Sequence, residues 1–374
     1  MLKRTNNIIL LFTLSLLLSF INVSAQDAST LAVAETNTEE TTDINVKEMI
    51  MSHIGDSYEW HFMKWKDKDI SIPLPIILHS KESGWNIFLS SELHNPNSKY
   101  NQFYIAQEGK HAGKIVEKDS SGAEIAPFDI SLTKNATSLV LTSILLIVIV
   151  MSVAQFYKRR DSMSTSKGLV GLIEIVVTFI VDEVAKPSIG KEYQRFTPFL
   201  LTIFFFILLN NLMGLIPIFP GGANVTGNIA VTLVLALTTF LVVNLTGSKA
   251  YYKDIFWPDV PTWLKAPAPI MPLIEIIGTI TKPFALMIRL FANITAGHSI
   301  VLGLTSVIFV TAKLGAATNG AMTMVAILFG IFIGLLEILV AFIQAYIFTL
   351  LSAVFIGLAR TPEGETKESV QTIE

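Results

Sequence analysis

Long apolar segments separated by short polar ones make up most of this chain after residue 138. A membrane-spanning helix needs about 20 mostly apolar residues. Residues 168–184 are marginal by that measure, because they carry Glu174 and, close to their end, Asp182 and Glu183. We therefore expect an all-α polytopic membrane protein with about five membrane helices and one interfacial helix at 168–184. The apolar segments lie at residues 139–156, 168–184, 196–216, 229–246, 271–305 and 321–359.

The last two apolar segments are too long for upright helices. Residues 321–359 number 39, so an unbroken helix would reach about 58 Å, against about 30 Å of hydrocarbon. Two spans would need a turn near Gly330 or Gly334, which would leave one arm too short. We expect one long helix at a strong tilt instead, lying beside a similarly long and tilted helix that contains residues 271–305.

Residues 1–25 have the pattern of a secretory signal peptide. Lys3-Arg4 precede an apolar core, and the small residues Val23-Ser24-Ala25 stand before Gln26. The alternative is an uncleaved first span. N-terminal sequencing of the mature protein separates the two, because cleavage predicts a chain that begins at Gln26.

Residues 26–134 form a polar region that a signal peptide would place outside the cytoplasm. Its first part, 26–46, is rich in Thr, Glu and Ala, which predicts disorder. Short aromatic and β-branched runs between Ile70 and Val116 predict a small β-rich domain. His53 and His61 flank two acidic residues and can be read as a metal site, but their spacing matches no ligand pattern, so a solvated surface is favoured.

Composition agrees with a membrane protein. Of 374 residues, 51% are hydrophobic and 15% are charged, whereas soluble domains carry about 25% charged residues. A net charge of −3 does not suggest a nucleic-acid partner. The sequence has no Cys, which excludes thiolate metal sites and disulfides, and no Gly-rich Lys loop for ATP. We therefore expect no metal, no cofactor and no enzyme activity of the chain by itself.

The distribution of Lys and Arg predicts the orientation. Residues 158–195, 248–270 and 359–374 hold seven, three and two of them, whereas 217–227 and 313–320 hold none and one. The positive-inside rule places the first set in the cytoplasm. The region 26–134 is then extracytoplasmic, and the polar tail 361–374, expected to be disordered, is cytoplasmic.

Arg289 is the strongest candidate for a functional residue. A charge at the centre of a spanning helix costs about 2.5–3.5 kcal/mol on insertion scales, and such residues are functional by default. On a helix, Glu275, Lys282 and Arg289 are spaced by sevens and Asn293 follows by four, so the four form one polar stripe. His298 lies about 13 Å further along the axis, half a turn round.

A second polar pair occurs in the last apolar segment. Glu337 and Gln344 are seven apart, on one face and about 10 Å apart along a helix. A glutamate in lipid needs a polar path or a partner such as His298, whose ordinary pKa of about 6.5 suits a proton relay. The alternative is a purely structural pair between helices.

These residues resemble subunit a of F-type ATP synthases. The resemblance lies in RLFANITAGH around Arg289, in Lys282-Pro283 before it, and in Glu337 and Gln344 after it, and it covers roughly residues 133–360. It implies that residues 135–360 form the membrane proton-channel domain of a bacterial inner-membrane stator. The implied partners are the c-ring subunits, the peripheral-stalk b subunits, the remainder of the ATP synthase, and membrane lipid.

The same resemblance implies a role for each site residue. Arg289 would be the essential fixed charge, with Asn211 near it. The extracytoplasmic half-channel would be lined by Asn293, His298, Glu337 and Gln344, and the cytoplasmic one by Glu275. In some members His and Glu exchange the positions of His298 and Glu337, and Gly214 stands where some relatives have an acidic residue.

A mechanism follows from the magnitude of the charge interaction. A carboxylate about 4 Å from Arg289 gains roughly 4 kcal/mol at an effective dielectric of 20, which lowers its pKa by about three units. By the resemblance, that carboxyl belongs to the c-ring and releases its proton on reaching Arg289.

Two other classes of function compete with this interpretation. An ion-coupled secondary transporter would show repeats and broken helices, and a membrane-anchored metal enzyme would use the N-terminal region.

Overall fold

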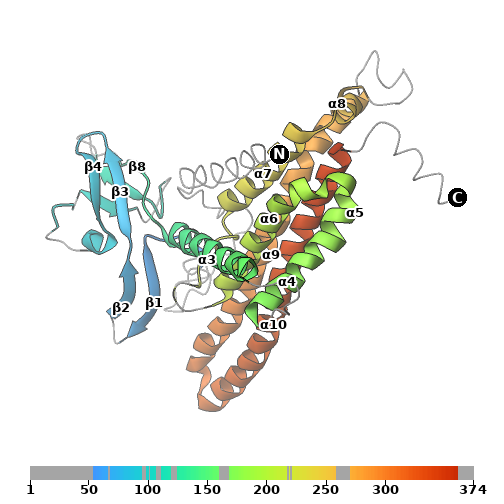
Figure 1. The fold of residues 1–374 in the computed structure, drawn as a ribbon. Helices are drawn as coiled ribbons and strands as arrows, with labels where there is room; N and C mark the ends of the chain where they lie inside the picture. The colour runs from blue at the N-terminus through green and yellow to red at the C-terminus, as the bar shows by residue number, and fades with distance from the viewer. Residues whose placement is uncertain are drawn as a thin grey trace.

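A computed structural model describes residues 54–65, 68–94, 98–100, 102–106, 111–118, 124–159, 168–216, 219, 221–257 and 270–360. The signal peptide, the 26–46 segment and the C-terminal tail expected from the sequence lie outside the described residues. A small β domain stands at one side of a bundle of long helices (Figure 1).

The β domain consists of short antiparallel strands in three sheets. Strands β1 (Glu59–Trp65) and β2 (Lys68–Pro73) pair with each other. The second sheet has the order β4-β3-β8, with β3 at Pro75–Ser80, β4 at Gly84–Leu89 and β8 at Phe128–Asp129. The third has the order β5-β6-β7, at Phe103–Ile105, Ile115–Lys118 and Glu124–Ile125. The β-rich domain expected within 70–116 is confirmed, and it extends further in both directions.

Alternation of side chains explains how this domain holds together. Along β3 every second residue is buried, as expected for a strand with one face toward a core. The buried side chains pack into one cluster made of Tyr58, Ile76, Leu78, Phe88, Phe103 and Ile115.

The helical part begins with α3 (Lys134–Lys158), followed by a run of helical turns over Leu169–Leu215. That run comprises α4 (Leu169–Phe179), a π-helical turn, α5 (Lys186–Ile189), a 3-10 turn and α6 (Tyr193–Leu215). The segment expected as an interfacial helix is α4, and it leads through the π turn towards α6. Among the described residues these are followed by α7 (Ile229–Thr246), α8 (Lys249–Phe256), α9 (Ile270–Thr311) and α10 (Ala316–Arg360).

Local capping explains where three of these helices begin. The hydroxyl of Thr133 accepts a hydrogen bond from the backbone N–H of Ala136 at the start of α3. Asn228 and Ser248 cap α7 and α8 in the same way. Each cap satisfies a backbone donor that the first turn of a helix leaves unpaired.

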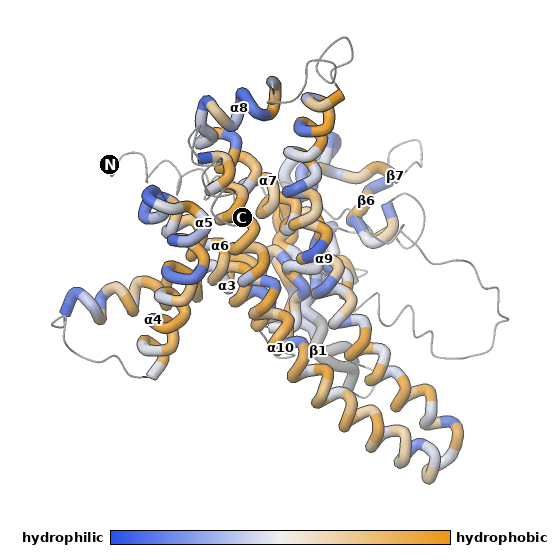
Figure 2. The backbone as a smooth tube through the Cα atoms, turned by 90° about the vertical axis from the view of Figure 1, so that its right-hand side faces the viewer, coloured by the Kyte–Doolittle hydropathy of each residue, from blue (hydrophilic) through white to orange (hydrophobic). Residues whose placement is uncertain are grey.

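Five helical segments of the described chain are long and apolar enough to cross a membrane (Figure 2). Helices α9 and α10 have 42 and 45 residues and run side by side without a break, as expected from the sequence (Figure 1). Straight helices of these lengths span more than 60 Å, about twice the hydrocarbon thickness, so we retain the prediction of a strong tilt.

The cytoplasmic end predicted for α10 is joined closely to its neighbours. A Cβ atom at Gly357 would stand 1.9 Å from the carbonyl oxygen of Ser188, so only glycine allows α10 to approach α5 there. Arg360 donates to the carbonyl of Thr246 at 2.9 Å and pairs with Glu192. The end of α10 is thereby tied to α7 and to the turn before α6.

The β domain is attached firmly to the helices. A carboxylate oxygen of Asp56 accepts hydrogen bonds from the backbone N–H groups of Ser57 and Asn135, and the N–H of Lys134 donates to Ser57. Trp60 is buried, and its ring meets that of Phe219, in the α6–α7 loop, edge to face at 5.0 Å. These contacts fix the domain to the first turn of α3 and to the α6–α7 loop.

Candidate functional site

Arg289 lies on an uncovered face of α9. Its side chain is exposed, as are those of Ile288 and Asn293, whereas the neighbouring Leu286 and Leu290 are buried. Among the described residues Arg289 has no hydrogen-bond or ion-pair partner. A permanent charge inside an apolar helix is therefore presented outward rather than neutralised within the chain.

His298 and Glu337 face each other across α9 and α10. The distance from His298 Nδ1 to Glu337 Oε1 is 3.7 Å, and the two side chains are 17% and 14% exposed. Oε1 of Glu337 is buried without a hydrogen bond. A distance of 3.7 Å exceeds a hydrogen bond, so a small movement of either side chain makes or breaks the contact.

Glycine permits this approach of the two helices. An added Cβ at Gly297 would stand 2.6 Å from Oε1 of Glu337, well inside van der Waals contact. On the other side of the imidazole, a Cβ at Gly214 would stand 3.4 Å from Nε2 of His298 and 3.3 Å from the carbonyl oxygen of Ala223. The ring thus lies between Glu337 and the last turn of α6, with the second nitrogen toward Gly214.

Asn211 and Gln344 are buried between helices. The amide of Asn211 donates to the carbonyl of Ala341 at 3.4 Å and accepts from the hydroxyl of Thr226 at 2.6 Å. Its hydrogen bonds therefore go to α10 and to the α6–α7 loop, and none goes to Arg289. Gln344 is 5% exposed and lies two turns beyond Glu337 on α10.

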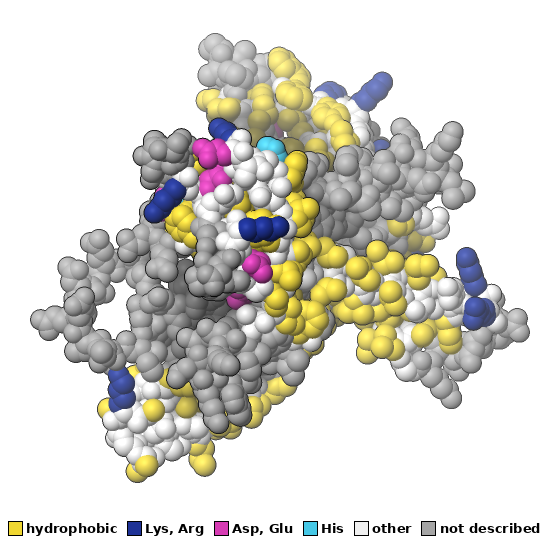
Figure 3. Space-filling model, turned by 90° about the vertical axis from the view of Figure 1, so that its left-hand side faces the viewer, with side chains coloured by type: hydrophobic (Ala, Val, Ile, Leu, Met, Phe, Trp, Pro, Cys, Tyr) yellow, Lys and Arg dark blue, Asp and Glu magenta, His cyan; other side chains and the backbone are white. Residues whose placement is uncertain are grey.

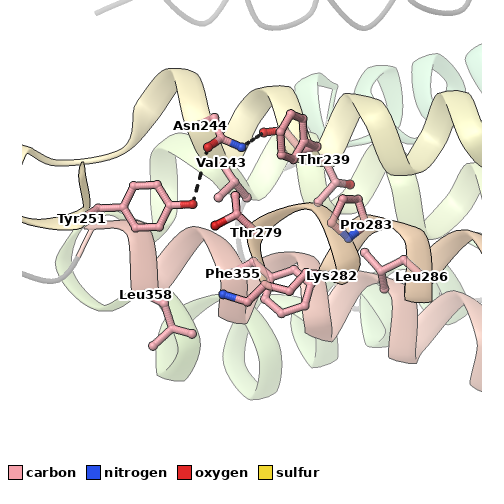
Figure 4. A pocket seen from close by; sticks show the side chains of 11 residues that line it. Thr239, Val243, Asn244, Tyr251, Thr279, Lys282, Pro283, Leu286, Phe355 and Leu358 are labelled. Atoms are coloured by element: carbon pink, nitrogen blue, oxygen red, sulfur yellow. Dashed lines mark hydrogen bonds between the residues drawn. The ribbon is translucent and has the colours of Figure 1, made fainter. Parts of the chain in front are cut away.

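Glu275 lies near the start of α9, close to a cavity that the sequence did not reveal. The hydroxyl of Tyr251 donates to the side chain of Asn244 at 3.5 Å in that cavity, and the ammonium of Lys282 stands 5.7 Å from the ring of Phe355 (Figure 4). Burial, and to a lesser extent the charge of Glu275, raises the pKa of Tyr251. The cavity lies among α7, α8, α9 and α10 and is lined by Thr239, Phe240, Val243, Asn244, Tyr251, Thr279, Lys282, Pro283, Leu286, Phe355 and Leu358.

The other hypothetical site, the His53–His61 pair, falls outside what can be described. Residue 53 precedes the described residues, and the side chain of His61 in β1 is not described. Within the described chain no group of three His, Asp or Glu side chains could hold a metal ion.

Comparison with known proteins agrees with the division of the chain into a β domain and a helical part. A family model described as ATP synthase A chain matches residues 139–357, and one described as a domain of unknown function (DUF8433) matches residues 49–138. "ATP synthase subunit a 2" of Chlorobaculum tepidum is 46% identical over 245 residues, 63% of this chain and 65% of that protein. The chain therefore spans slightly less than two thirds of that relative.

Two further relatives are similar over a comparable stretch. "ATP synthase subunit a" of Chloroherpeton thalassium is 44% identical over 252 residues, 66% of this chain and 72% of that protein. The protein of the same name from Myxococcus xanthus is 41% identical over 239 residues, 62% of this chain and 73% of the relative.

The contact at Gly297 yields a prediction about stability. Gly297→Ala places its methyl group 2.6 Å from Oε1 of Glu337, so the end of this flexible side chain has to move. We expect a cost near the lower end of the about 1–3 kcal/mol that overpacking takes. Gly303→Ala on the same helix is the matched control, because no atom lies within 4 Å of an added Cβ there. We expect denaturant unfolding of the full chain in detergent to show destabilisation by Gly297→Ala only. Equal stability of the two variants would contradict a role for this contact in holding α9 against α10.

Proposed function

Because this chain belongs to the ATP synthase A chain family, we propose that it is the proton-translocating stator subunit of the membrane sector of an F-type ATP synthase. The observation that carries the proposal is the exposed Arg289, unpaired among the described residues, on the same long helix as His298, which faces Glu337 of α10. A fixed charge on the surface of the helical bundle suits a partner that moves past it.

The partner that fits this face is the ring of c subunits, each with a carboxyl group. A carboxyl that arrives protonated through lipid meets Arg289 and loses its proton, because the nearby positive charge favours the carboxylate. Since Arg keeps its charge, it also blocks a proton from passing directly between the two half-channels. The ring therefore has to turn for protons to cross, and that rotation drives ATP synthesis by the other subunits.

We assign the half-channels from the family resemblance and from the orientation that the Lys and Arg distribution predicts. On the extracytoplasmic side we place His298, Glu337, Gln344 and Asn293. The short His298–Glu337 distance supports a relay there, since a proton on either group is within one small movement of the other. On the cytoplasmic side we place Glu275, and Asn211 holds α6 against α10 beside the path. The peripheral-stalk b subunits would keep this stator from turning with the ring.

The proposed orientation puts the β domain outside the cytoplasm and the end of α10 in the cytoplasm, on the basis of the Lys and Arg distribution. A secondary transporter is less well supported, because its site would be built from discontinuous helices, whereas α9 and α10 are continuous.

A relay between His298 and Glu337 predicts functional coupling. Removing either group should slow proton flux by roughly 10²-fold or more, as expected for loss of positioned proton transfer. The double exchange His298→Glu with Glu337→His should recover more flux than either single change, because it restores one acid and one imidazole in contact. Proton pumping by membrane vesicles measures this, and purely additive losses would show that the two residues act separately.

The role of Arg289 predicts a sharp result for a conservative change. Lysine loses its proton readily when desolvated and lacks the planar fork that holds a carboxylate. Arg289→Lys should therefore abolish ATP-driven pumping in an assembled complex, and Arg289→Ala should also allow passive proton leak. Arg195→Lys is the matched control, because Arg195 lies at the start of α6, where it pairs with Glu192 at 3.8 Å and stands 5.4 Å from the ring of Phe196. Normal acidification by vesicles carrying assembled Arg289→Lys complex would refute this mechanism.

A further inference from the structure

One sheet of the β domain carries apolar side chains on both of its faces. Its inner face belongs to the domain core. On the outer face, Trp85, Ile87 and Leu89 of β4 and Phe128 of β8 are 59%, 66%, 49% and 55% exposed. Both Trp85 and Phe128 stand opposite His79 of β3, so the three form one row across the sheet. A single polar residue, His79, interrupts this group.

The outer face continues towards the membrane helices. Ile87 stands opposite Ile77, and the next row pairs Leu89 with Pro75. Beyond β8 the chain stays beside β3, because the N–H groups of Ile130 and Leu132 donate to the carbonyls of Ile77 and Pro75 at 3.0 and 3.1 Å. We define the outer sheet face by these three rows, which contain no Asp, Glu, Lys or Arg. A contiguous apolar patch of this kind marks a contact with a membrane or with another protein.

The position of α3 distinguishes between these occupants. Leu132 is two residues before Lys134, where α3 begins, so the outer sheet face adjoins the start of a candidate membrane span. The middle of α3 is exposed and apolar, with Ile144, Ile147 and Met151 among its uncovered side chains. In Figure 3 hydrophobic side chains gather along one edge of the β domain, beside α3, which extends to the right. The face is therefore continuous with a surface that lipid covers.

We propose that the outer sheet face of the β domain rests on the outer surface of the membrane, with its aromatic and aliphatic side chains in the boundary between headgroups and acyl chains. Trp and other amphipathic rings are enriched at that depth. Binding of this type grows with the apolar area that is buried and needs no charge on the sheet. The contacts of Asp56 and Trp60 with the helices hold the domain firmly against the bundle. The proposal does not depend on the proton path.

The absence of Cys makes the full chain suitable for single-site labels. We would place one nitroxide spin label at Ile87→Cys or, on a different strand of the same face, at Phe128→Cys. The control is Lys118→Cys, an exposed residue of β6 in the other three-stranded sheet. The full chain is reconstituted at low density in vesicles of phosphatidylethanolamine and phosphatidylglycerol. Collision of each label with oxygen, which concentrates in lipid, is compared with collision with a water-soluble nickel complex.

The expected result is a several-fold higher oxygen-to-nickel ratio at positions 87 and 128 than at position 118. A water-like ratio at positions 87 and 128 would overturn the proposal. Protection from both reagents would also overturn it, because it would show that protein covers the face, either residues 1–53 of this chain or a second copy. Both reporter positions are more than half exposed, so neither substitution removes a core contact.

Discussion

The close approach of α9 and α10 at Gly297 is the constraint on which the polar site depends. A side chain larger than hydrogen at this position would occupy the space of the Glu337 carboxylate. Because the two helices meet there, the side chain of Glu337 is largely buried and has His298 as its neighbour at 3.7 Å. A carboxylate in an apolar helix is costly unless it has such a neighbour. The close packing of the two helices therefore also supplies the partner that Glu337 needs.

The same pair of helices separates two kinds of polar residue. Those that lie between the helices, His298 of α9 and Glu337 and Gln344 of α10, are largely enclosed. Arg289 and Asn293 of α9 are exposed. Enclosed groups can pass protons along a fixed path. An exposed charge can act only on something that another molecule brings to it. This division is what the proposed stator needs, since the path is stationary and the carboxyl moves.

The β domain is tied to this arrangement through the α6–α7 loop. Trp60 packs against Phe219 in that loop, and further along the loop Ala223 lies against Gly214 beside the ring of His298. At a second point of contact, Asp56 accepts a hydrogen bond from the N–H of Asn135 in the first turn of α3. Burial raises the pKa of Asp56, with the backbone N–H groups of Asn135 and Ser57 acting against it. The domain therefore forms a continuous packed structure with the end of the bundle that carries the α6–α7 loop.

The sequence by itself determined the apolar segments, the single long helices and the β-rich region, because hydropathy, length and spacing are local properties of the chain. It also identified Arg289, His298 and Glu337 as candidate functional residues, because each is an ionisable residue within an apolar segment. It also placed Glu337 and Gln344 on one face, since helical periodicity is fixed. Only the tertiary structure decided that His298 meets Glu337, that Asn211 binds Ala341 and Thr226, and that Tyr251 and Lys282 border a common cavity. These contacts join residues far apart in the chain, and they depend on how far each helix is rotated and shifted against its neighbour. Helix rotation and shift are set by packing at positions such as Gly297 and Gly357, which no local pattern of apolar and polar residues records.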